Sequence, residues 1–122
     1  MHEMSICQGL LNQVEQIAHE RGASRVDSIV LSIGPLAGVE PKLLNRAFEI
    51  ARLDTVARDA ELEIETGPVV VECRICGGSG EVQVNRLLCP SCGGWQVDLT
   101  QGDELLLLRL EISEINPLGK AE

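Results

Sequence analysis

Four cysteines in two matched pairs constrain this chain more than any other feature of its sequence. The pairs are Cys73-Arg74-Ile75-Cys76 and Cys89-Pro90-Ser91-Cys92, and two glycines follow each of them. Two Cys-x-x-Cys pairs separated by a short loop are typical of a tetrahedral zinc site. Glycine adopts the positive φ that the tight turn after each second cysteine often requires. The spacing therefore predicts that Cys73, Cys76, Cys89 and Cys92 bind one zinc ion.

The predicted site is structural, because four thiolates fill the zinc tetrahedron and leave no position for a reactive water. A thiol redox centre is the alternative, but a redox Cys-x-x-Cys normally stands singly at the start of a helix. The fifth cysteine, Cys7, lies on the apolar face of a predicted helix and is expected to be a small buried side chain.

The charge of the chain argues against a nucleic-acid-binding zinc ribbon. The net charge is −9, and residues 69–102 contain two arginines against three acidic residues. A nucleic-acid binder needs a basic surface, and a single-strand binder also needs stacking aromatics. Phe48 and Trp95 are the only aromatic residues. A zinc-ribbon adaptor or nucleic-acid-binding module without nickel function remains the alternative interpretation.

The sequence also predicts where the protein resides and that it is not an enzyme. Its start lacks the basic and apolar regions of a signal peptide, and its longest apolar run, Leu105 to Leu108, is too short to cross a membrane. We expect a cytoplasmic protein without membrane contact, in which thiols stay reduced and favour metal over disulfides. His2 and His19 are the only histidines, and neither stands in a recognisable nucleophile–base set.

Hydrophobic periodicity predicts an α+β fold with two helices and a sheet of about three strands. Apolar residues at three- and four-residue steps predict a helix over 4–21, and a second helix is expected to begin at Pro41. Alternation predicts strands at 25–34, 61–66 and 105–113. The strand at 105–113 is expected to pair in the same sheet as the first two strands. A zinc-ribbon-like module is then inserted between the strands at 61–66 and 105–113. We predict an α+β domain from residues 1–68 and 103–122, a zinc module at 69–102, and a frayed tail from Asn116.

The amino terminus carries a second group of metal donors. Methionine is trimmed only before small residues, so Met1 is expected to stay in front of His2. The terminal amine, the His2 amide nitrogen and the His2 imidazole can then close a five- and a six-membered chelate ring. Such nitrogens suit square-planar Ni(II) or Cu(II). On chemistry alone, an ordinary exposed histidine is the favoured interpretation of His2, because a histidine at the second position is not rare.

Three features together resemble the HypA/HybF nickel metallochaperones of [NiFe]-hydrogenase maturation: the Met1-to-Ser5 start, the paired cysteines, and the run Ile33-Gly34-Pro35 followed by Glu40. The resemblance implies a transferable Ni(II) bound by Met1, His2 and Glu3, with Glu40 helping, beside a structural Zn(II). It also implies two partners, a HypB-type GTPase and the large subunit of [NiFe]-hydrogenase, with urease as a further client in some relatives. Whether the chain is a monomer or a homodimer stays open.

Overall fold

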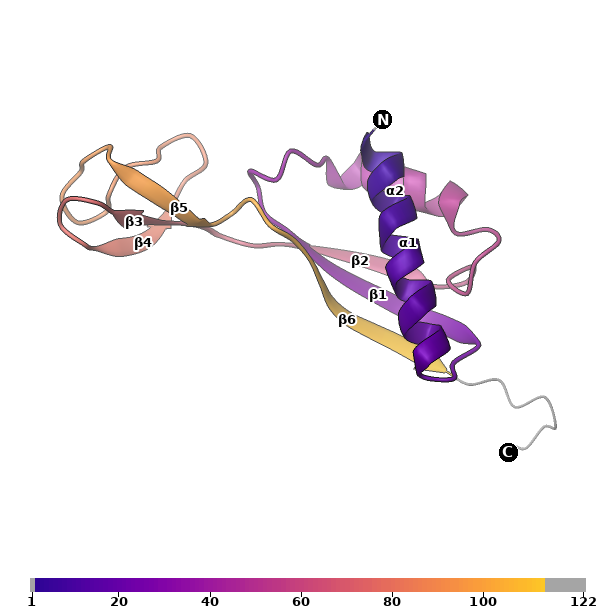
Figure 1. The fold of residues 1–122 in the computed structure, drawn as a ribbon. Coiled ribbons are helices and arrows are strands. Elements are labelled where there is room, and N and C mark those ends of the chain that lie inside the picture. The colour runs from indigo at the N-terminus through magenta and orange to yellow at the C-terminus, as the bar shows by residue number, and fades with distance from the viewer. Residues whose placement is uncertain (1, 114–122) are drawn as a thin grey trace. The chain divides into compact units, whose positions relative to one another are not determined.

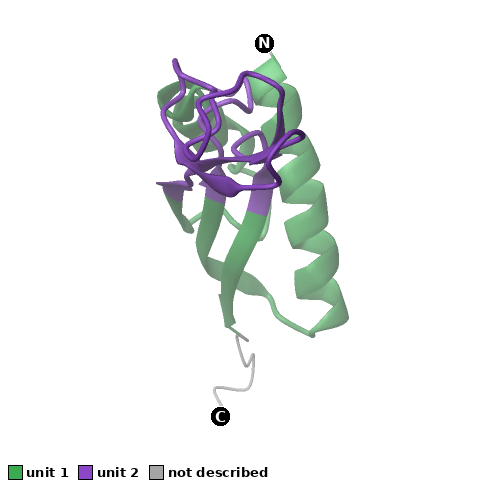
Figure 2. Cartoon of the chain, turned by 90° about the vertical axis from the view of Figure 1, so that its left-hand side faces the viewer, with its two compact units in different colours: residues 1–31, 40–63, 107–122 green, residues 32–39, 64–106 purple. Residues whose placement is uncertain are grey.

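The computed structural model describes residues 2–113, which form two compact units (Figure 2). Of the described residues, unit 1 contains 2–31, 40–63 and 107–113, and unit 2 contains 32–39 and 64–106. Met1 and the tail from Asn116, which was predicted to fray, lie outside the described residues.

The first helix, α1 (His2–Glu20), buries one apolar face in unit 1, as its periodicity predicted. Cys7, Val14 and Ala18 are fully buried along that face, whereas His19 is exposed. The helix ends where Gly22 adopts a φ of 67°. This left-handed residue lets the N–H of Ala23 donate to the carbonyl of Ala18 at 2.8 Å, which closes the last turn.

The second helix, α2 (Pro41–Ala51), begins at the proline expected to start it. Proline suits this first position because its missing N–H would have no intrahelical acceptor there. Leu44, Ala47 and Phe48 form its buried stripe. The Cys7 thiol of α1 donates to the Leu44 carbonyl at 3.4 Å, so the two helices pack against each other and Cys7 is a buried packing residue.

Three strands form the sheet that these helices accompany, in the order β2-β1-β6 (Figure 1). They are β1 (Arg25–Ile33), β2 (Glu61–Thr66) and β6 (Leu105–Ser113). The prediction that the last strand returns to the sheet of the first two is therefore confirmed. The central strand β1 supplies the densest part of the core, because Ile29, Val30 and Leu31 are each at most 1% exposed.

Unit 2 contains a second sheet that the sequence analysis did not anticipate, in the order β4-β3-β5. Its strands are β3 (Val69–Cys73), β4 (Ser79–Val82) and β5 (Val97–Gln101). Both neighbours run antiparallel to β3, with Val71 opposite Gly80 on one side and Leu99 on the other. The first cysteine therefore stands at the end of a strand, and the sheet positions the cysteine loops.

The compact units and the predicted domains divide the chain at different residues. The units change inside the strands β1, β2 and β6, so the same strands enter both. Compactness by itself does not assign function, and the division into 1–68 with 103–122 and 69–102 stays a prediction.

Candidate metal centre

The four paired cysteines gather at one point of unit 2. Their Sγ atoms all lie within 4.8 Å of one another. The Sγ atoms of Cys73 and Cys92 are 3.7 Å apart, and those of Cys76 and Cys89 are 3.5 Å apart. Four sulfurs placed about 2.3 Å from a zinc ion stand about 3.8 Å apart in a tetrahedron. The cluster therefore suits a structural zinc site.

Each Cys-x-x-Cys pair forms the same turn, in which backbone N–H groups donate to the first sulfur. The Sγ of Cys73 accepts from Ile75 N at 3.3 Å and from Cys76 N at 3.4 Å. The Sγ of Cys89 accepts from Ser91 N at 3.3 Å and from Cys92 N at 3.4 Å. These donors stabilise thiolates, which are the form that binds metal.

The glycines after each pair have separate tasks. Gly77 and Gly93 adopt φ of 76° and 75°, and this lets their N–H groups donate back to the carbonyls of the first cysteines. Gly78 and Gly94 follow, and a Cβ there would lie 3.3 Å from the Cys76 sulfur and 3.4 Å from the Cys92 sulfur. The first glycine of each pair thus turns the chain, and the second leaves room for a sulfur.

The hydrogen bonds divide the four thiols into two classes. The N–H of Cys92 lowers the pKa of Cys89 to about 6, and the N–H of Cys76 likewise lowers the pKa of Cys73. The N–H of Gly78 also acts to lower the pKa of Cys76, but the neighbouring Cys89 sulfur and desolvation outweigh it and raise that pKa to about 11. The arrangement thus favours a thiolate on the first cysteine of each pair before any metal binds.

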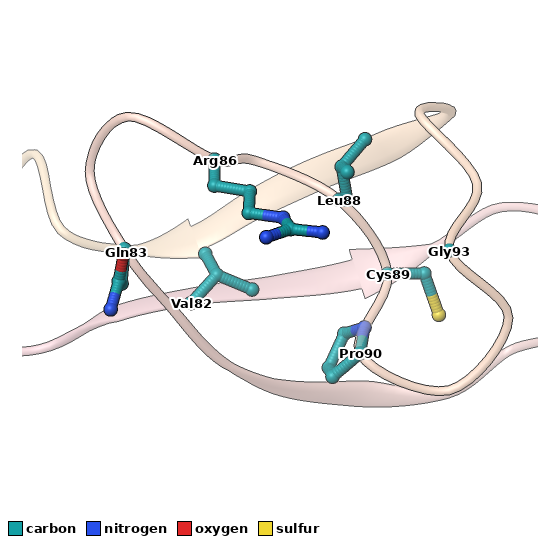
Figure 3. A pocket seen from close by; sticks show the side chains of 7 residues that line it. All are labelled: Val82, Gln83, Arg86, Leu88, Cys89, Pro90 and Gly93. Carbon is teal, nitrogen blue, oxygen red and sulfur yellow. The ribbon is translucent and has the colours of Figure 1, made fainter.

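A shallow pocket of about 330 Å³ lies beside this cluster (Figure 3). It is lined by Val82, Gln83, Arg86, Leu88, Cys89, Pro90 and Gly93. Figure 3 shows the side chain of Arg86 extending toward the middle of the pocket. Cys89 is the only cysteine, histidine or carboxylate residue among its lining residues, so the pocket adds no thiolate or imidazole donor to the four cysteines.

Of the predicted amino-terminal donors, His2 and Glu3 stand at the start of helix α1, and Glu3 contacts the residue before α2. His2 has an exposed side chain, and its Nε2 lies 3.6 Å from the Oε2 of Glu3. Glu3 is buried, and the same Oε2 accepts a hydrogen bond from Glu40 N at 3.5 Å. Burial acts to raise the pKa of Glu3, but backbone hydrogen bonds and nearby His2 outweigh it and lower that pKa. The structure therefore brings His2, Glu3 and the Glu40 backbone together.

The buried carboxylate of Glu3 is the feature of this end that the sequence did not reveal. The resemblance implied Glu3 and Glu40 as participants at the nickel site. The structure adds a contact between the Glu3 carboxylate and the Glu40 backbone, which lie 37 positions apart. No local pattern signals a contact over that separation. Within residues 2–113, the cysteine cluster remains the one group of three or more metal-binding side chains with all ligand atoms close together.

No helix among the described residues is both long and apolar enough to cross a membrane.

Comparison with known proteins identifies the family. A family model described as "Hydrogenase/urease nickel incorporation, metallochaperone, hypA" matches residues 1–112. A hydrogenase maturation factor HypA of Nitrosospira multiformis is 46% identical, over 92% of this chain and 97% of that protein. HypA of Aquifex aeolicus is 41% identical, over 92% and 97%.

Solved structures agree in fold. The solution structure of the Ni metallochaperone HypA from Helicobacter pylori has a TM-score of 0.73 at 30% identity and covers 93% of this chain and 98% of that one. A second solution structure of a HypA protein also has a TM-score of 0.73, at 32% identity over 92% and 96%. The predicted α+β architecture is confirmed, and the chain belongs to the HypA family of nickel metallochaperones of hydrogenase maturation.

Proposed function

We propose that this metallochaperone carries Ni(II) at its amino terminus through the Met1 amine, the His2 amide and imidazole, and the Glu3 amide. The observation that carries the proposal is the contact of the Glu3 carboxylate with Glu40 N at 3.5 Å. This contact joins the first turn of α1 to the residue before α2, and it supports a site that His2 and Glu40 share. Nitrogen donors from a chain terminus suit square-planar Ni(II).

The electrostatics of the amino-terminal site favour reversible binding of a cation. The start of a helix carries a positive partial charge, which opposes metal binding. The Glu3 carboxylate, whose pKa is lowered, stays negative and offsets that charge. Glu40 is exposed and adds a second carboxylate at the edge of the site. An exposed His2 can pass its metal to a partner without unfolding the helix behind it.

The zinc ligands in this proposal are Cys73, Cys76, Cys89 and Cys92. Zinc held by four thiolates has no open position and supplies folding energy rather than catalysis. The two metals then use separate ligands. We infer that the chain performs no catalysis of its own, and that it works in the cytoplasm, where thiols stay reduced. None of the five cysteines forms a disulfide, which agrees with this location.

The partners proposed are a HypB-type GTPase and the large subunit of [NiFe]-hydrogenase, with urease maturation as a further client. The support is the match to a family described by hydrogenase and urease nickel incorporation. Mixing the purified chain with each partner and measuring complexes by native mass spectrometry tests this. We expect no salt-sensitive binding to nucleic acid, because the net charge of −9 repels phosphate.

Calorimetric titration with Ni(II) tests the terminal site. The parent chain should bind one nickel, and His2→Ala should abolish binding while zinc stays in place. His19→Ala is the matched control, because it removes an exposed histidine from the same helix. Affinity should rise between about pH 6 and about pH 8, since metal must displace a proton from an amine with a reference pKa of about 7.7–8.0. If His2→Ala binds nickel as the parent does, the terminal site is wrong.

A further inference from the structure

Strand β6 stands at one end of the β2-β1-β6 sheet with only one neighbour among the described strands. Its apolar side chains are poorly covered for a core strand, because Leu106 is 50% exposed and Leu108 is 51% exposed. An edge strand of this kind offers unpaired backbone groups to another strand.

The sequence of β6 has a pattern that matters only if such a strand pairs with itself. Leu108, Leu110 and Ile112 share one face by alternation, and Arg109 and Glu111 share the other. The two charged side chains are 60% and 62% exposed, and Arg109 Nε lies 4.0 Å from Glu111 Oε2. Read in either direction from Leu110, the order is apolar, charged, apolar, with opposite charges on the two sides.

We propose that β6 binds β6 of a second copy of this chain as an antiparallel pair centred on Leu110. In that register, Arg109 lies opposite Glu111 of the second copy, and Glu111 lies opposite its Arg109. Opposite charges directly across an antiparallel pair are stabilising. On the other face, Leu108 lies opposite Ile112 of the second copy, and the two Leu110 side chains meet. The contact is isologous, as expected for a homodimer.

The apolar face of β6 continues into a hollow that can accept side chains from a second copy. A shallow groove of about 280 Å³ runs between β6 and α1, and its lining includes Ile17, Leu108, Leu110 and Ile112. Pairing along β6 would therefore cover the exposed Leu108 side chain, and burial of apolar surface drives association.

The opposite edge of the same sheet, strand β2, is unsuited to self-pairing, and this contrast supports β6 as the edge that dimerises. Strand β2 carries Glu61, Glu63 and Glu65 on one face, all of them exposed. Antiparallel self-pairing there would set glutamates opposite glutamates, which is destabilising. Charged side chains are a common protection of edge strands against association. One edge is thus protected by like charge, and the other is complementary to itself.

Charge reversal on β6 tests the proposal by sedimentation equilibrium of the zinc-loaded chain at low salt. Arg109→Glu and Glu111→Arg should each raise the dimer dissociation constant by about tenfold or more, because each sets like charges opposite each other twice. The double variant R109E/E111R should restore the parent value. An equimolar mixture of the two single variants should form a heterodimer, since their charges are then complementary.

Arg58→Glu is the matched control, because it makes the same charge change at an exposed residue away from β6 and should leave dimerisation unaltered. Far-ultraviolet circular dichroism confirms that every variant folds. The proposal is overturned if the parent chain stays monomeric up to millimolar concentration, or if the double variant fails to recover. Loss of binding to a hydrogenase partner in the single variants, without any parent dimer, would assign the edge to that partner instead.

Discussion

The two units of this protein are each stabilised internally by a different kind of interaction. In unit 1, both helices and the sheet bury aliphatic side chains such as Val14, Ile29 and Leu44, each fully inaccessible to solvent. In unit 2, the buried apolar residues are Ile33, Val69, Val71, Cys73 and Cys89, so two of the five belong to the cysteine cluster. The most exposed of the large apolar side chains, Trp95 at 74% and Ile75 at 69%, also lie in unit 2.

The difference teaches that the stability of each unit has its own source. Full burial of one leucine or isoleucine contributes about 1.5–3 kcal/mol, and unit 1 has many such residues. The cysteine region has too few for a core of its own, and a structural zinc ion supplies what is missing. The zinc contribution and the hydrophobic contribution can therefore be perturbed in separate experiments.

The strongest test of this separation is removal of the metal. Chelation, or Cys89→Ser, should cost the cysteine module on the order of 10 kcal/mol, the contribution typical of structural zinc. Amides of β3 to β5 should lose hydrogen-exchange protection. The helical circular dichroism signal should persist, because α1 and α2 both belong to unit 1. Cys7→Ser should keep its zinc. Collapse of the helical signal on chelation would contradict the separation.

The reverse experiment removes a buried apolar side chain from unit 1 and leaves the zinc ligands intact. Leu44 is 0% exposed, and Leu44→Ala should lower the free energy of unfolding of unit 1 by about 2–5 kcal/mol, measured by urea denaturation at the helical signal. Zinc content should not change. Leu43→Ala, at a neighbouring side chain that is 48% exposed, should cost far less. Zinc loss from Leu44→Ala in the folded protein would show that the two units depend on each other.

A pair of glycine substitutions sharpens the comparison, because the same change should act in opposite directions. Gly77→Ala meets no atom within 4 Å, yet its φ of 76° makes alanine cost about 1 kcal/mol. A competing chelator should then remove zinc about fivefold more readily. Gly9→Ala also meets no atom within 4 Å but lies inside α1, where alanine should stabilise by about 0.5–1 kcal/mol. Equal signs for the two changes would refute this account.

The smallest effect is expected at the exposed ion pair between Arg74, which directly follows β3, and Asp98 of β5. Arg74 Nη2 lies 2.6 Å from Asp98 Oδ1, and the side chains are 66% and 52% exposed. Solvent screens such pairs, so Arg74→Ala should change chelator competition by less than about twofold. Its hydrogen bond to Asp98 lowers the pKa of that carboxyl. The stabilisation is therefore present above the usual Asp pKa, fades as the pH falls through the lowered value, and should be absent from Arg74→Ala.

Periodic segments of this fold were predictable and short ones were not. The strands at 61–66 and 105–113 were predicted to the residue, and α1 begins two residues before its predicted start. Each carries a repeat long enough to distinguish a helix from a strand. The strands β3, β4 and β5 have at most five residues and lie among glycines and cysteines, so no period develops. These strands form because they pair with one another around β3, and the sequence of a single segment does not reveal its pairing partner.

The candidate sites divide in the same way. The cysteine spacing predicted a cluster, and the structure brings the four sulfurs together. The role of Glu3 as a buried link to Glu40 depends on the packing of α1 beside α2, which the local sequence does not specify. The exposure of Leu106 and Leu108 was equally hidden, because an apolar strand reads alike at the edge and in the centre of a sheet.

The close passage of two glycines in unit 2 has a consequence for protein engineering. The N–H of Leu36 donates to the carbonyl of Gly102 at 2.7 Å, and the N–H of Gly34 donates to Glu104 at 2.8 Å. A Cβ on Gly34 would overlap the Gly102 carbonyl, and Gly102 itself has a φ of 136°. A chimera that exchanges cysteine modules between relatives therefore has to take the Gly34 and Gly102 segments from the same parent. If the two segments came from different parents, their backbones would have to make this close contact without having evolved together.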